Sequence, residues 1–385
     1  MNWIDSYFKG DRTIWLVVIL LSIVSILAVY SSTGTLAYKY QSGNTEYYLF
    51  KHFIILLFGF GLMYFAHMVK YTFYARLSKI ALFITVPLLA LTLASGTNLN
   101  EASRWLTLPV VNLSFQTSDL AKLSLILFVA RMLSKKQDNI KDFKGAFLPI
   151  MLPVILVCGL ILPANFSTAA VLFATCMVLM FIGRINVKYI LSLMGIAVLA
   201  FGLFLTIAWL TGYEGRIKTW QARIENFSKG DSEGNYQVEQ AKIAIATGGL
   251  VGKGPGNSTS RNFLPHPYSD FIFAIIIEEY GLFGGAGIVL LYIMLFFRAI
   301  RIVRNTERAF AALVTIGCAF SLVFQAMINM AVAVNIFPVT GQPLPMLSMG
   351  GTSIWFTSLA LGIILSVSAD IEQEQHSGGG EFAAA

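Results

Sequence analysis

One aspartate, Asp270, stands where a long polar stretch of the sequence gives way to an apolar run. A carboxylate at the edge of a membrane segment is costly unless it has a partner or a function. Because an ionised carboxylate can take a proton from a hydroxyl group, Asp270 is a candidate general base. The structural alternative is a helix N-cap, since Ser269-Asp270 precedes the run and both residue types favour that position. The two roles are compatible.

A second charged pair lies in another apolar segment. Asp119 and Lys122 are three positions apart, which places them on one face of a helix. An internal ion pair that neutralises both charges is the simpler interpretation. The functional alternative is that Lys122 contacts an anionic lipid head group while Asp119 positions it.

Two adjacent acids, Glu278 and Glu279, lie deeper in the segment that follows Asp270. Neighbouring helix positions point about 100° apart, which predicts separate partners for the two side chains. At least one is expected to face the interior of the helix bundle. Four glycines that could bend this segment or allow close packing follow: Gly281, Gly284, Gly285 and Gly287.

A glycine-rich run at 248–256 has a loose likeness to phosphate-binding loops. It lacks the lysine-serine ending and the strand–helix context of such loops, so a flexible or tight-turning loop is the simpler interpretation. Basic residues near it predict an outward positive patch, suited to a diphosphate or to anionic lipid: Arg216, Lys218, Arg223 and Lys253. Arg104 beside Trp105 is typical of an anchor at the head-group level.

The composition indicates the kind of protein that carries these residues. Of 385 residues, 56% are hydrophobic and 12% are charged, whereas soluble domains carry about 25% charged residues. The net charge of +7 comes mostly from short loops between apolar runs. It therefore indicates membrane topology and no nucleic-acid partner.

The elements that must position the acids are predicted to be membrane helices. A spanning helix needs about 20 apolar residues. Ten segments qualify: 13–31, 49–67, 74–95, 117–134, 146–163, 166–184, 187–211, 270–298, 309–334 and 352–369. We therefore expect an all-α polytopic membrane protein with about ten transmembrane helices and a large extracytoplasmic loop, 212–269, between the seventh and the eighth.

The Lys and Arg residues of the short loops alternate in a way that predicts both termini on the cytoplasmic side and Asp270 on the outer face. A tight hairpin is expected at 163–165 and a helix at 236–246. Residues 1–375 form one predicted membrane domain. The end, 376–385, reads as a cloning scar.

The motifs, taken together, resemble the SEDS family (shape, elongation, division and sporulation), whose members include FtsW and RodA. The resemblance covers almost the whole chain. It rests on segments 269–275, 278–281, 236–240, 248–258, 338–341, 348–353 and 102–105, and on Lys122, Gln325 and Asn329. The wording of these motifs favours an FtsW-like member over a RodA-like one.

Several positions depart from the family pattern. Asp119 replaces a glutamate and keeps its charge. Asn165 and His266 stand where the family often has acids, so an acid role does not carry over to these two positions.

The resemblance implies a peptidoglycan glycosyltransferase of cell division or elongation. It would polymerise lipid II, an undecaprenyl-diphosphate-linked disaccharide-pentapeptide, by inverting transfer on the outer face of the cytoplasmic (inner) membrane, with Asp270 as general base. The expected substrate-binding residues are Lys122, Arg104, Arg216, Tyr236, Gln237, Gln240, Ser258, Gln325, Asn329, Ser348 and Ser353. Asp119, Glu278 and Glu279 are expected to support them.

The implied partners are a class B penicillin-binding protein, which is a transpeptidase, and other membrane proteins of the divisome or elongasome. No cofactor is certain, and a divalent cation, Mg²⁺ or Mn²⁺, stays open because charge builds on a leaving diphosphate. Two other functions also stay open: a lipid II translocase, and a scaffold of the division machinery without chemistry. A translocase needs charges near mid-bilayer, whereas a transferase needs its base at the rim, and Asp270 favours the transferase.

Overall fold

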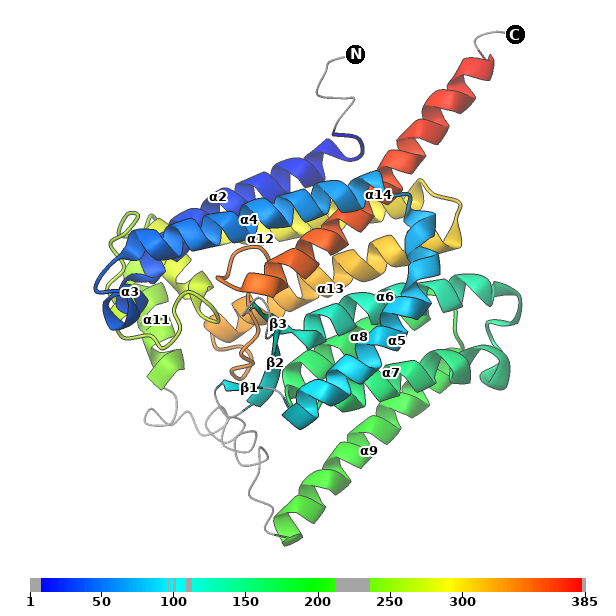
Figure 1. Cartoon of the computed structure of the whole chain (residues 1–385), viewed down its shortest axis with the longest axis horizontal. Helices are drawn as coiled ribbons and strands as arrows, with labels where there is room; N and C mark the ends of the chain where they lie inside the picture. Colours follow the sequence, from blue (N-terminus) through cyan, green and yellow to red (C-terminus); the bar gives the residue numbers. More distant parts are fainter. Residues whose placement is uncertain (1–7, 96, 100–101, 109–112, 212–235, 383–385) are drawn as a thin grey trace.

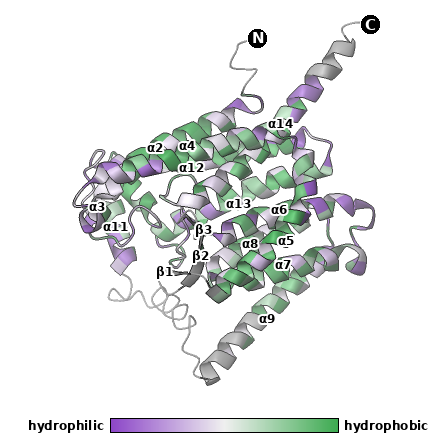
Figure 2. Cartoon of the chain, viewed as in Figure 1, coloured by the Kyte–Doolittle hydropathy of each residue, from purple (hydrophilic) through white to green (hydrophobic). Residues whose placement is uncertain are grey.

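The computed structural model describes residues 8–95, 97–99, 102–108, 113–211 and 236–382. Long helices lie side by side as a bundle, and a small sheet and short helices gather at one end of it (Figure 1). Apolar residues cover most of the helices, and hydrophilic residues concentrate at the two ends (Figure 2). This is the distribution expected of a protein that crosses a bilayer.

The first half of the chain forms a helical layer and the sheet. Its elements are α2 (Arg12–Ser32), α3 (Gly34–Tyr40), α4 (Thr45–Met68), α5 (Tyr71–Ser95), β1 (Thr97–Leu99), β2 (Ala102–Leu108), β3 (Leu113–Gln116) and α6 (Thr117–Lys135). A 3₁₀ turn (Gln137–Asn139) and a π-helical turn (Phe143–Phe147) connect α6 to the next helix.

The second half adds the helices that carry most of the candidate residues. They are α7 (Leu148–Ile161), α8 (Phe166–Ile182), α9 (Val187–Thr211), α11 (Tyr236–Gly248), a 3₁₀ turn (Ser260–Asn262), α12 (Ile272–Arg304), α13 (Ala309–Ala333) and α14 (Gly351–Phe382). In Figure 1, α9 projects away from the bundle, α12 and α13 lie within it, and the C-terminal part of α14 extends beyond it.

A helix occupies each of the ten predicted segments. Within the described residues, seven helices are long and apolar enough to cross a membrane, and two shorter apolar stretches, Phe166–Ile182 and Val187–Leu199, accompany them. The prediction of a multi-pass helical membrane protein is confirmed. The number of ten spanning helices and the outer loop between the seventh and eighth stay predictions, and residues 212–235 of that loop lie outside the described part of the chain.

The three-stranded sheet was not predicted. Its strands pair antiparallel in the order β1-β2-β3, and Trp105 on β2 lies opposite Gln116 on β3. The backbone N–H of Gln116 donates to the hydroxyl of Thr352, at the start of α14, over 3.2 Å. The sheet therefore joins the entry of α6 to the entry of α14.

The hairpin between α7 and α8 is as tight as predicted. Asn165 is the N-cap of α8, and its side-chain oxygen accepts from the backbone N–H of Thr168 at 3.2 Å. Its amide thus has a local structural role, which agrees with the absence of an acid here.

The described residues near the two chain ends lie together beside the C-terminal end of α12. Asp11, which caps α2, forms an ion pair of 2.6 Å with Arg298, near the end of α12. The backbone N–H of Gly10 donates to a carboxylate oxygen of Glu372 on α14 at 3.0 Å. Since Asp270 precedes the first residue of α12, this helix runs from the candidate site to the termini.

Helix α12 is broken at Gly281, whose φ of 69° and ψ of −174° are not helical. The glycine-rich loop bonds to the backbone on both sides of the break. The N–H groups of Lys253 and Gly254 each donate over 2.9 Å, to the carbonyl oxygens of Glu278 and Glu279 respectively, and the N–H of Leu282 donates to the carbonyl of Gly249 at 2.9 Å. The loop thereby satisfies backbone groups that the break frees inside an apolar region.

Close approach explains the glycines in this loop. A Cβ atom at Gly281 would lie 2.2 Å from the carbonyl oxygen of Leu250, and one at Gly252 would lie 2.2 Å from that of Glu279. Both glycines also have positive φ. The run is therefore a tight turn packed on α12, as its simpler interpretation predicted, and the N–H groups at 252–254 are occupied.

Candidate active site

Asp270 lies two residues before the first residue of α12. The N-cap is Phe271, and no side chain bonds to the first turn, so the N-cap role considered for Asp270 is wrong. Its Oδ1 accepts from the hydroxyl of Ser269 at 3.0 Å. Gly341, with a φ of 65°, lies close to the other oxygen: a Cβ there would be 3.7 Å from Oδ2. The half-buried carboxylate thus faces a loop instead of its own helix.

The backbone around Asp270 is held at three consecutive carbonyl oxygens. The carbonyl oxygen of Tyr268 accepts from the N–H of Met349 at 2.9 Å, and the carbonyl oxygen of Ser269 accepts from the hydroxyl of Ser348 at 2.6 Å. The carbonyl oxygen of Asp270 accepts from the side-chain amide of Asn329 at 2.9 Å. The donors come from α13 and the segment before α14, so two distant parts of the chain fix the acid.

Asn329 also ties this segment to α13. Its amide donates to the carbonyl of Gln342 at 2.7 Å, and the Gln342 side chain donates to the hydroxyl of Thr168 on α8 at 2.5 Å. One turn earlier on α13, Gln325 donates to the carbonyl of Pro343 at 2.9 Å. Gln325, Asn329 and Gln342 are all buried, and their contacts make one continuous polar network.

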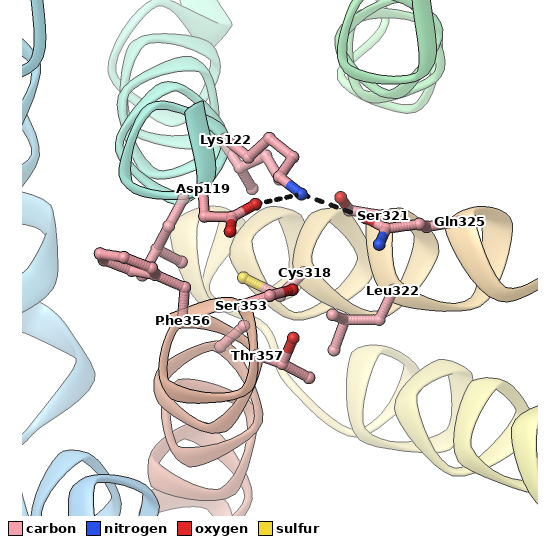
Figure 3. A pocket seen from close by; sticks show the side chains of 12 residues that line it. Asp119, Lys122, Cys318, Ser321, Leu322, Gln325, Ser353, Phe356 and Thr357 are labelled. Carbon is pink, nitrogen blue, oxygen red and sulfur yellow. Dashed lines mark hydrogen bonds and ion pairs between the residues drawn. The ribbon is translucent and has the colours of Figure 1, made fainter. Parts of the chain in front are cut away.

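Lys122 joins the same network from α6. Its Nζ lies 2.7 Å from Asp119 Oδ1 and donates to Gln325 Oε1 at 3.1 Å (Figure 3). The predicted ion pair is present, and Asp119 is buried. The other Asp119 oxygen, Oδ2, has no hydrogen-bond partner among the described residues.

A small cavity opens beside this pair, between α6, α13 and α14 (Figure 3). Its volume is about 40 Å³, and its polar lining comes from Asp119, Lys122, Ser321, Gln325, Ser353 and Thr357. That volume holds water molecules but no sugar. Asp270 does not line it, and α13 connects the two places through Gln325 and Asn329.

Glu278 and Glu279 are both fully buried and bind the loop at 258–260. The Glu278 carboxylate accepts from Lys253 at 2.6 Å and from the hydroxyls of Ser258 at 2.5 Å and Thr259 at 3.0 Å. Glu279 accepts from the hydroxyl of Ser31 and from the backbone N–H of Ser258.

The prediction of separate partners is therefore wrong for Ser258, which contacts both acids. The reason is that its N–H and its hydroxyl point to different carboxylates. Ser258 was expected to bind substrate, yet it is buried and both of these groups are used inside the protein. Lys253, expected in an outward patch, is paired with Glu278.

The other predicted site residues are placed as follows. Tyr236, Gln237 and Gln240 lie on α11, where Tyr236 is exposed and the two glutamines are half-buried. Arg104 lies on β2, and its side chain is outside the described part of the structure. Arg216, with Lys218 and Arg223, falls in 212–235, which is outside it too.

Three residues of the polar network around Asp270 were not predicted from the sequence. Gln342 and Thr168, 174 positions apart, lock the segment before α14 to α8. Tyr268 hydrogen-bonds with His266 Nδ1 over 3.1 Å, and burial raises the pKa of its phenol, so the group stays neutral at physiological pH. No local spacing signals such contacts, although the clustering of 266–270 next to the acid could have marked Tyr268.

The described side chains limit how this protein could hold a divalent cation. Among the described residues, no three His, Cys, Asp or Glu side chains gather to hold a metal ion. One carboxylate can still share a cation with a diphosphate, because Mg²⁺ is commonly bound by one or two carboxylates and substrate phosphates. Asp270 fits that arrangement, whereas a site built of protein ligands alone does not.

Fold and site define a multi-pass membrane protein with a fixed acid at one end of its bundle. The family model for the cell cycle proteins FtsW, RodA and SpoVE matches residues 11–373. The chain therefore belongs to this family, as its motifs predicted.

Relatives of known name agree. Stage V sporulation protein E of Bacillus subtilis is 32% identical over 369 residues, which cover 93% of this chain and 96% of that protein. A protein of Trichlorobacter lovleyi named "Probable peptidoglycan glycosyltransferase FtsW" is 31% identical over 366 residues, 94% of each chain.

Solved structures share the fold. A chain of a peptidoglycan synthase complex, in a study of how polymerization and crosslinking are coordinated, aligns with a TM-score of 0.74 over 94% of this chain and 99% of that one. Rod shape determining protein RodA of Thermus thermophilus aligns with a TM-score of 0.68 over 95% and 98%. Sequence identity is 24% in both cases.

Proposed function

We propose that this chain is a peptidoglycan glycosyltransferase of cell division that polymerises lipid II, with Asp270 as the general base. The enzyme class is the one in the names of its FtsW relatives. The observation that carries the role of Asp270 is the fixation of three consecutive carbonyls around it by Met349, Ser348 and Asn329. Such fixation holds a base in one geometry without using its carboxylate.

The proposed step is a single displacement. Asp270 takes the proton of an acceptor sugar hydroxyl, and that oxygen forms a bond to the anomeric carbon of the donor sugar. The bond from this carbon to the diphosphate oxygen breaks, and the lipid diphosphate leaves with the electron pair. One displacement inverts the configuration at the anomeric carbon.

The leaving diphosphate needs positive charge. Lys122 is a candidate because it is 14% exposed and lies in the polar network that reaches Asp270. It would have to exchange part of its contact with Asp119 for the diphosphate. Arg104 and Arg216 are candidates from sequence. A cation shared between Asp270 and the diphosphate would supply the same charge.

The other predicted residues divide into three groups. Gln325, Asn329 and Ser348 act through the backbone that holds Asp270 and are proposed as positioning residues. Glu278, Glu279 and Ser258 hold the loop against α12. Tyr236, Gln237 and Gln240 on α11, and Ser353 in the cavity, stay proposed substrate contacts.

The proposed orientation places Asp270 on the outer face of the cytoplasmic membrane and both termini in the cytoplasm. The basic loops support this through the positive-inside rule. The described residues near both chain ends lie together at the end of α12 that is opposite to Asp270, which agrees with this orientation. A class B penicillin-binding protein and further divisome or elongasome proteins are proposed partners, since a structural relative belongs to a peptidoglycan synthase complex.

A lipid II translocase is the second candidate. It would use the buried charges of Asp119, Lys122 and Glu278 as a path. Those charges are engaged with other protein groups, and the cavity of about 40 Å³ beside the first two is far too small for a disaccharide. The transferase is therefore favoured over the translocase. A scaffold without chemistry would not explain why hydrogen bonds hold the backbone around Asp270.

The test is polymer formation from lipid II by the purified protein in detergent, with its transpeptidase partner present, where no membrane crossing is needed. Asp270→Asn should lower the rate by about 10²–10⁴-fold and leave the melting temperature close to that of the wild type. Glu239→Gln, which changes an exposed acid on α11, is the matched control and should keep full activity.

Equal polymer from wild type and Asp270→Asn would refute the base. No polymer from any protein, combined with transfer of lipid II across vesicles, would favour the translocase. Normal division of cells that carry only Asp270→Asn would favour the scaffold.

A further inference from the structure

The segment 342–349, which holds the backbone around Asp270, lies inside the bundle and forms neither helix nor strand. Most of it is buried, and Met346 within it has a positive φ of 64°, which is unusual for a residue with a side chain. Irregular backbone inside a membrane bundle is tolerated only where other protein groups satisfy its hydrogen bonds. The groups that hold this segment therefore decide where its donors to the backbone around Asp270 lie.

Side chains of the surrounding helices supply these groups. Three carbonyl oxygens of the segment accept from side chains of α12 and α13: those of Gln342, Pro343 and Pro345. A fourth, that of Leu347, accepts from the hydroxyl of Ser25 on α2 at 2.9 Å. Leu347 directly precedes Ser348, whose hydroxyl donates to the carbonyl oxygen of Ser269. Helix α2 therefore anchors the segment one residue away from a contact that fixes Asp270.

His52 on α4 orients this serine. Its Nε2 lies 2.8 Å from the hydroxyl oxygen of Ser25, and both side chains are fully buried. A hydroxyl has one hydrogen, which Ser25 gives to Leu347, so His52 donates from Nε2. Its Nδ1 has no partner among the described residues, so a proton there would be buried without an acceptor. The ring is therefore neutral, and the contacts form one chain from His52 through Ser25 to Leu347.

We propose that His52 and Ser25 are positioning residues of the transfer reaction, because through Leu347 they hold the segment that fixes Asp270. The inference rests on the proposed role of Asp270 as general base. The chain ends at a carbonyl, so its effect reaches the acid through the backbone of 347–349. A displacement of about 1 Å can lower a rate by about 100-fold. Loss of the chain should therefore lower turnover more than it weakens the binding of lipid II.

The first test uses the full chain in detergent with its transpeptidase partner. Ser25→Ala should lower the maximal rate of polymer formation by about 10-fold, while the apparent affinity for lipid II changes by less than about twofold. Ser22→Ala makes the same substitution one turn earlier on α2, at a buried hydroxyl that has no partner among the described residues. It should match wild type. An equal loss of rate in both variants would overturn the proposal.

Two substitutions of His52 test the donor at Nε2. A glutamine can place its amide N–H where Nε2 lies, whereas the shorter asparagine cannot reach Ser25. His52→Gln should therefore keep most of the rate, and His52→Asn should lose about as much as Ser25→Ala does. The double variant His52→Asn/Ser25→Ala should be no slower than Ser25→Ala, because the histidine acts through the serine. Equal rates for His52→Gln and His52→Asn would overturn the role of the histidine.

Amide hydrogen exchange follows the segment without reference to catalysis. Ser25→Ala and His52→Asn should speed exchange at 347–349 by about 10-fold, and Ser22→Ala should not. Unchanged exchange in the first two variants, or faster exchange at the wild-type rate of polymer formation, would overturn the positioning role. Failure of the base is distinguishable, because Asp270→Asn would then keep full activity while exchange in Ser25→Ala would still be faster.

Discussion

The side-chain amide of Asn329 donates to the backbone carbonyl oxygen of Asp270 at 2.9 Å, from a position 59 residues further along the chain. The same amide donates to the carbonyl of Gln342. One buried side chain of α13 thus joins the acid before α12 to the loop before α14. The contact is made through the backbone carbonyl, so it fixes the place of Asp270.

Replacement of this amide tests its positioning role. Asn329→Leu removes both hydrogen bonds at similar volume and should lower the free energy of unfolding by about 1–3 kcal/mol, because two buried carbonyls lose a donor. Polymer formation should fall while the apparent affinity for lipid II changes little. Activity assays at several lipid II concentrations separate the two effects.

The control for Asn329 lies on the same helix. Thr315 is fully buried, and its hydroxyl has no partner among the described residues, so Thr315→Val should leave stability and activity unchanged. Full activity of Asn329→Leu would contradict the positioning role.

The break in α12 makes a prediction about two glycines. Gly281→Ala places a Cβ atom 2.2 Å from the carbonyl oxygen of Leu250 at a positive φ, and it should destabilise the protein by about 3–5 kcal/mol. Gly287→Ala, on the same helix with no atom within 4 Å of its Cβ, should be neutral or stabilise by up to about 1 kcal/mol. Thermal unfolding in detergent measures both, and equal melting temperatures would refute the strain.

Single and double variants of Asp119 and Lys122 distinguish a structural role of this ion pair from a role in catalysis. Lys122→Met leaves a buried carboxylate unpaired and should cost about 3–5 kcal/mol. Asp119→Asn/Lys122→Met removes both charges and should recover most of that stability. Polymer formation should stay lost in the double variant, because the proposed diphosphate contact is missing. Recovered polymer would mean that Lys122 serves only to neutralise Asp119.

The contacts of the loop at 258–260 predict that substitution of Glu278 destabilises the protein more than substitution of Lys253. Glu278→Gln turns an amide towards several donors of the loop, so the protein should lose about 2–3 kcal/mol of stability. Lys253→Met should cost less, about 1 kcal/mol, because Lys253 is 28% exposed and other donors remain. Lys242→Met, an exposed lysine on α11, is the control. A larger effect of Lys253→Met than of Glu278→Gln would contradict this account of the loop.

The helices were predicted well because a long apolar segment in a membrane satisfies its own backbone hydrogen bonds by forming a helix. The sequence placed Asp270 correctly beside the start of α12 and predicted the pairing of Asp119 with Lys122, and Gly281, where α12 is broken, is one of the four glycines that could bend this helix. These features depend on residues that are near one another in the chain.

What the sequence could not predict depends on distant residues. The N-cap interpretation of Asp270 was wrong because α13 and the segment before α14 hold its backbone away from the first turn. Ser258 was expected at substrate because the family resemblance implied it, yet Glu278 and Glu279 hold it. The strands β1 to β3 were missed since their residues show no clear alternation between two turns.

The interruption at Gly281 divides α12 into unequal arms. The short arm carries Asp270 and is bonded to the loops around it, while the long arm extends to Arg298 and the chain ends. Because the loop at 249–254 is hydrogen-bonded to the backbone on both sides of this interruption, the two arms are held at a fixed angle to each other.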